Sequence, residues 1–139
     1  WNFQLPASVY GANPQLTADD DLLRPLAQHY PGDRFAQYTT ARDAVQIGFY
    51  ALMTHGNACR EWTQQMTRDL TRRELRGNFR AYVADGENHT ILRSPLFYTE
   101  QSGGMPFSQW LGTMLGSTGV GWDNRTCAEC AAAPRACPR

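Results

Sequence analysis

Two residues of this sequence, Asp43 and His89, have the types and the spacing that acid–base catalysis requires. Asp43 follows a run of aromatic and β-branched residues at 33–40, and His89 lies in a polar turn after a similar run at 79–85. Such runs are typical of strands, and functional groups of open α/β sheets gather at the carboxyl ends of strands. We therefore expect the Asp43 carboxylate to lie about 2.6 to 3.2 Å from His89 Nδ1.

A histidine paired with a carboxylate can activate a hydroxyl nucleophile. Histidine, with an ordinary pKa of about 6.5, takes the proton from a serine hydroxyl and passes it to a leaving alkoxide. The aspartate fixes the tautomer of the ring and stabilises the imidazolium as it forms. A carboxylate after one strand, a helical crossover and a histidine after the next strand match the order in which α/β-hydrolases deliver these two triad members.

The serine that would complete a triad is missing. A nucleophile elbow has the pattern G-x-S-x-G between a strand and a helix. That context is absent at each of the serines, which are Ser8, Ser94, Ser102, Ser108 and Ser117. The serine and the oxyanion hole are therefore expected outside this sequence.

Structural roles are the alternative for both candidates. Asp43 precedes an apolar helical stretch and is of a type that caps helices well. His89 in a polar loop has the surroundings of an ordinary surface histidine. His29 and His55 lie near a helix end and a turn, and we expect no chemistry from either.

The elements that would position these residues alternate between helix and strand. Helices are expected from Thr17 to before Pro31, over 43–53, over 57–75 and over 105–117. The helix over 43–53 is apolar almost all round, which predicts burial on most sides. The pattern indicates an α/β fold with a mostly parallel sheet. Because two strands alone are marginal in water, we expect a separate chain or a missing N-terminal segment to complete that sheet.

Three stretches together resemble a known family. "YTTARDAVQIGFY" at 38–50, "GENHTILRSPLFY" at 86–98 and "MPFSQWLGTML" at 105–115 are similar to the C-terminal part of the pectin acetylesterase and Notum-like α/β-hydrolases, in their bacterial branch. The resemblance spans roughly residues 15 to 116 and matches a D-x-x-Q step from Asp43 to Gln46, with His89 after the last strand. It implies a Ser-His-Asp carboxylesterase whose serine lies upstream.

The resemblance implies the domain division, and the cysteines indicate the pinned tail and the localisation. Residues 1–116 are expected to form the C-terminal portion of one hydrolase domain, and residues 117–139 a Cys-rich tail pinned by a disulfide. We expect Cys127 or Cys130 to pair with Cys137, or one of them with Cys59. A buried free thiol at Cys59 is the alternative. Disulfides indicate a secreted or periplasmic protein.

The composition excludes two classes of binding partner. The formal net charge is zero and no long apolar run is present, so neither nucleic acid nor a membrane is expected as a partner. No metal or cofactor is expected either. Together with the resemblance, the placement of Asp43 and His89 predicts a carboxylic ester hydrolase in which this chain supplies these two residues. A companion chain, produced by proteolytic processing of the same precursor, supplies the serine in a heterodimer. The alternative is a non-catalytic module that binds a polymer or a protein.

Overall fold

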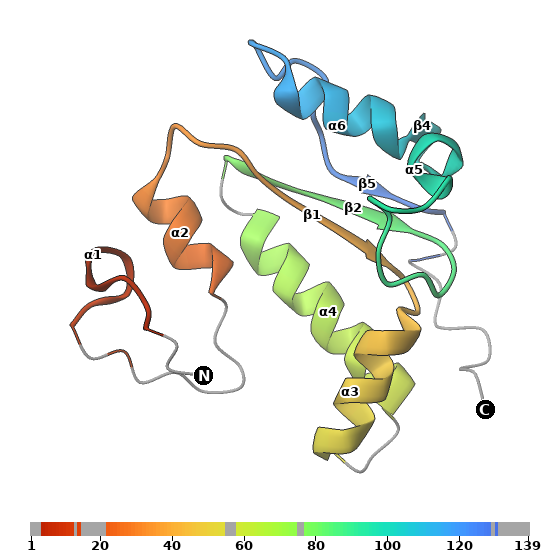
Figure 1. Ribbon diagram of the computed structural model, residues 1–139, viewed down its shortest axis with the longest axis horizontal. Coiled ribbons are helices and arrows are strands. Elements are labelled where there is room, and N and C mark those ends of the chain that lie inside the picture. Colours follow the sequence, from red (N-terminus) through yellow and green to blue (C-terminus); the bar gives the residue numbers. More distant parts are fainter. Residues whose placement is uncertain are drawn as a thin grey trace.

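The computed structural model describes residues 4–12, 14, 22–54, 58–74, 77–128 and 130. The elements follow one another in this order: α1 (Ala7–Tyr10), α2 (Leu23–His29), β1 (Phe35–Thr40), α3 (Ala44–Thr54), α4 (Ala58–Glu74), β2 (Phe79–Ala84), α5 (Leu96–Thr99), β3 (Gln101–Ser102), β4 (Met105–Pro106), α6 (Phe107–Leu115) and β5 (Arg125–Thr126). Figure 1 shows helices on both sides of one sheet.

The main sheet is parallel, in the strand order β1-β2-β5. β1 and β2 pair over their full length, from Phe35 opposite Phe79 to Thr40 opposite Ala84. The expected mixed α/β class with a parallel sheet is therefore confirmed. β5 was not expected, because two residues are too short to produce a strand pattern, and it lies in the stretch predicted to be the tail. The small antiparallel pair of β3 and β4 was not expected either.

The two faces of β2 are buried by different helices. Tyr82 and Ala84 point toward α6 and pack with Phe107 and Trp110, whereas Phe79 and the other odd-numbered residues face α4. In Figure 1, α6 lies on one side of the sheet, and α2 and α4 lie on the other. Because both faces are covered, nearly every β2 side chain is buried, as is usual in parallel sheets.

The central helices begin and end close to the expected residues. α4 covers 58–74 where 57–75 was predicted, and α6 starts directly after Pro106. The predicted helix start at Thr17 lies outside the described residues. No helix among the described residues is long and apolar enough to cross a bilayer.

The expectation that the helix over 43–53 is buried on most sides was wrong. α3 contains no buried residue, and Phe49, Leu52 and Met53 are 62, 75 and 69% exposed. The helix packs against α4, and none of the described residues covers its outer side. The apolar composition of α3 predicted that its side chains would be buried, but in the described chain they remain exposed.

The cysteine pairing also differs from the prediction. Cys127 and Cys130 are bonded to each other, so neither pairs with Cys59 or Cys137. Cys127 N–H donates to the carbonyl of Val83, and Cys130 N–H donates to that of Cys127. This turn places the two Cα atoms 5.2 Å apart, within the usual disulfide range. Cys59 is buried and disulfide-bonded, so the alternative of a free thiol was wrong as well.

Candidate functional site

Asp43 is held where β1 turns into α3. The strand ends at Thr40, and Asp43 immediately precedes the helix. Its Oδ1 accepts the backbone N–H of Gln46 at 2.9 Å, and its carbonyl accepts that of Ile47 at 2.9 Å. The first bond satisfies an N–H group that the first turn of a helix otherwise leaves unpaired, and the second is the first backbone bond of the helix itself. Asp43 is therefore the N-cap of α3.

The loop that carries His89 is fastened to the same turn. Backbone N–H groups within 41–44 donate to carbonyl oxygens within 84–87 at 2.9 to 3.1 Å. The Thr40 hydroxyl donates to the Asn88 carbonyl at 2.9 Å. Gly86 has φ of +94°, a conformation that favours glycine. Because the loop is bonded to the residues flanking Asp43, the position of His89 is set relative to that carboxylate.

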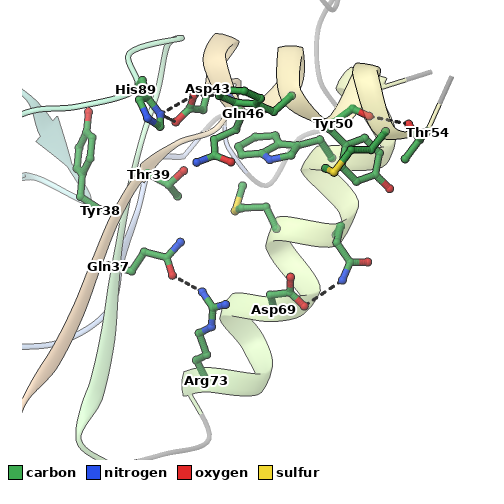
Figure 2. A pocket seen from close by; sticks show the side chains of 15 residues that line it. Gln37, Tyr38, Thr39, Asp43, Gln46, Tyr50, Thr54, Asp69, Arg73 and His89 are labelled. Carbon is green, nitrogen blue, oxygen red and sulfur yellow. Dashed lines mark hydrogen bonds and ion pairs between the residues drawn. The ribbon is translucent and has the colours of Figure 1, made fainter. Parts of the chain in front are cut away.

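The expected contact between the two candidate residues is present. His89 Nδ1 lies 2.9 Å from Asp43 Oδ2 and 3.1 Å from Oδ1. A carboxylate can only accept, so the Nδ1–H of the ring is the donor and Nε2 is left without a proton in the neutral imidazole. Figure 2 shows the ring and the carboxylate facing each other across the carboxyl end of the sheet.

Burial distinguishes the two residues. The Asp43 side chain is 3% exposed, while that of His89 is 39% exposed. A buried carboxylate requires hydrogen bonds or a charged partner, and Asp43 has its bonds from His89 and from the Gln46 N–H. The helix-cap role of Asp43 and its contact with His89 therefore exist together, one through Oδ1 and the other mainly through Oδ2.

The second ring nitrogen of His89 is available. None of the described residues forms a hydrogen bond with His89 Nε2. Ser102, which is buried, donates its hydroxyl to the Val83 carbonyl at 2.6 Å, and the Ser94 hydroxyl accepts from the Leu96 N–H. Neither serine is directed to the histidine, which agrees with the absence of an elbow in the sequence.

Two hollows meet at His89. One, of about 520 Å³, lies between β1 and the helices α3 and α4 and contains Asp43 in its wall. The other, of about 610 Å³, lies between β1, the loop after His89 and α6. His89 and Tyr38 line both. Figure 2 shows the side chains that line the first hollow.

Sequence reasoning missed two residues at this site. The ring of Tyr38 stacks on that of Tyr82. The Tyr38 hydroxyl is buried and has no hydrogen-bond partner among the described residues. Burial raises the pKa of Tyr38, and the charges of Glu100 and Asp43 raise it further. Thr40 fixes the loop through Asn88. Both lie in β1, where aromatic and β-branched residues are ordinary strand formers, so no signal separated them from their neighbours.

Comparisons with protein-family models, curated proteins and solved structures give no match. Among the described residues no group of three or more His, Cys, Asp or Glu side chains could hold a metal ion. The arrangement of Asp43, His89 and an accessible Nε2 is suited to acid–base chemistry.

Proposed function

We propose that this chain supplies the aspartate and the histidine of a Ser-His-Asp carboxylic ester hydrolase. The observation that carries the proposal is the 2.9 Å contact between His89 Nδ1 and Asp43 Oδ2, with Nε2 free of any bond from the described residues. The positions of both residues beyond the ends of neighbouring parallel strands support it. So does the resemblance of their sequence surroundings to the Notum-like hydrolases.

The two residues would act together on a hydroxyl delivered to Nε2. The serine oxygen forms a bond to the ester carbonyl carbon while its proton moves to His89 Nε2. The imidazolium, stabilised by the Asp43 carboxylate, then returns that proton to the departing alkoxide. A water molecule then bonds to the acyl carbon while its proton moves to Nε2, and the imidazolium gives that proton to the serine oxygen as the acyl–serine bond breaks.

The serine and the oxyanion hole are proposed to come from a companion segment, produced by cleavage of the same precursor. Surface loops are the usual sites of such cuts. We further propose that the protein is secreted or periplasmic. The disulfide between Cys127 and Cys130 supports an oxidising compartment, because disulfides rarely persist in the cytosol.

The test uses the complete enzyme and the substrate p-nitrophenyl acetate. His89→Ala should lower kcat by several orders of magnitude, because serine is a weak nucleophile without a base. His29→Ala is the matched control, since His29 is an exposed residue at the end of α2. Near-normal hydrolysis by His89→Ala would refute the triad and favour the alternative, in which this chain is a module that contributes no catalytic residue to the assembly.

A further inference from the structure

Thr40 ends β1 as a fully buried threonine, with 0% of its surface exposed. Its backbone lies opposite that of Ala84 at the end of β2. Its hydroxyl donates to the Asn88 carbonyl at 2.9 Å, across 48 residues of sequence. Threonine hydroxyls often bond to a carbonyl of a nearby residue in the chain. This hydroxyl instead reaches the loop that carries His89.

The bond from Thr40 is the last fastening of this loop before His89. The backbone bonds between the turn after β1 and the loop after β2 end at the Glu87 carbonyl, which accepts an N–H at 3.1 Å. Among the described residues no backbone bond of the loops and turns involves Asn88 or His89. The next anchored residue is Ile91, which is buried in the core cluster beside α6. His89 is therefore held between the Thr40 bond and Ile91.

The Asn88 carbonyl belongs to the peptide group that joins Asn88 to His89. Because a peptide group is planar, the bond from Thr40 fixes the orientation of this plane. It thereby fixes the direction in which the His89 side chain leaves the backbone, with Nδ1 2.9 Å from Asp43 Oδ2. Asn88 is itself exposed. Without the hydroxyl, water can satisfy its carbonyl and the loop is free to turn outward.

A second side-chain contact holds the start of the same loop. Arg42 forms an ion pair with Asp85 at 2.9 Å, and the two side chains are 24 and 49% exposed. Exposed ion pairs contribute little, because water and salt screen them. The pair also holds the beginning of the loop, whereas the Thr40 bond is on the peptide group that adjoins His89. The Thr40 hydroxyl therefore has the greater influence on the histidine.

We propose that Thr40 is a positioning residue for acid–base catalysis by His89. Its hydroxyl holds the peptide group before His89 so that Nδ1 meets Asp43 and Nε2 stays accessible. Thr40 is fully buried and lines neither hollow, so it acts through His89 and does not touch a substrate. The effect on catalysis rests on the proposed function, while the effect on the orientation of the ring rests on these contacts alone.

The test removes the hydroxyl and keeps the shape of the side chain. Thr40→Val in the complete enzyme should lower kcat for p-nitrophenyl acetate by about 10- to 100-fold, because a displacement of about 1 Å can cost a factor of 10². KM should be nearly unchanged, since Thr40 does not contact the substrate. Thr40→Ser keeps a hydroxyl and should restore most of the lost kcat. Thr113→Val is the matched control, because the Thr113 hydroxyl bonds to the Trp110 carbonyl at 2.7 Å within α6.

Nitrogen NMR of the imidazole gives a second readout, which reports the ring itself. In a neutral imidazole the nitrogen that carries the proton is distinguished from the one that does not. The signals of His89 are identified by their loss in His89→Ala. We expect Nδ1 to carry the proton in the wild type, in Thr40→Ser and in Thr113→Val, and both tautomers to be present in Thr40→Val. A role of Thr40 in stability alone would not change the tautomer.

Circular dichroism and the melting temperature show whether Thr40→Val is folded. If it is not, Thr40→Ala is compared with Thr40→Ser, from which it differs by a single oxygen atom. A folded variant without the hydroxyl that keeps the wild-type kcat or the wild-type tautomer would overturn the proposal. If the wild type hydrolyses no ester, the proposed function fails and the NMR comparison still decides the positioning role. If hydrolysis depends on His89 but not on Thr40, the positioning role alone fails.

Discussion

Replacing Asp43 by asparagine separates the two roles of this carboxylate. Asparagine is as good an N-cap as aspartate, so its side-chain oxygen can keep the 2.9 Å bond from the Gln46 N–H that starts α3. It cannot keep both contacts with His89, because an amide presents N–H donors where Oδ2 now accepts from Nδ1. The imidazole would then favour the wrong tautomer, with its proton on Nε2.

The expected size of each effect follows from these contacts. The loss of the correct tautomer should lower kcat by about 10⁴-fold, as the same change does in a serine protease. That factor corresponds to about 5 kcal/mol of transition-state stabilisation. The free energy of unfolding should change by less than about 1 kcal/mol, because the cap is retained. Asp43→Ala removes the cap as well and should cost about 1 to 2 kcal/mol, the upper part of the range, because the side chain is 3% exposed.

The assay measures kcat and KM for p-nitrophenyl acetate, together with urea unfolding, for both variants of the complete enzyme. Asp33→Asn is the matched control, since Asp33 is exposed. We expect it to leave both quantities near the wild-type values. The reasoning is refuted if Asp43→Asn keeps activity within tenfold of the wild type while Asp43→Ala loses only stability. That pattern would make Asp43 a helix cap and nothing more.

Three further predictions concern the triad, the disulfide and alkaline pH. The kcat of the double variant Asp43→Asn/His89→Ala should be within a few-fold of the kcat of His89→Ala, because triad members act as a unit. A loss in kcat equal to the product of the two single losses would contradict this. Replacing Cys127 and Cys130 together by alanine should lower the free energy of unfolding by about 2 kcal/mol, since the closed loop is short. A non-reducing peptide map should recover the two cysteines linked, and finding them as free thiols would disprove the pairing. Burial raises the pKa of Tyr82 to about 12 from 10.0. The contribution of the protonated Tyr82 hydroxyl to the free energy of unfolding is therefore fully present below pH 10 and is lost as the pH rises through 12. Tyr82→Phe should flatten that fall in urea unfolding curves, and an unchanged slope would assign it to other groups.

The sequence by itself determined the elements around the site. Strand formers at 35–40 and 79–84, and the amphipathic repeat of α4, produced boundaries within one or two residues of those observed. Those signals are local, because side-chain period and propensity act over a few residues. The sequence also located Asp43 and His89 at strand ends, and the order of strand, crossover and strand was enough to predict their contact.

Only the tertiary structure decided what lies across the sheet and along its edges. β5 is two residues long and becomes a strand only because β2 offers it a partner. The pairing of Cys127 with Cys130 depends on the turn that follows β5, and spacing alone allowed several pairings. Likewise, the apolar composition of α3 could not reveal that its outer side faces no described residue. Strand pairing and burial are relations between distant segments, and the disulfide forms in a turn that is bonded to β2. All three therefore depend on three-dimensional packing that no local pattern encodes.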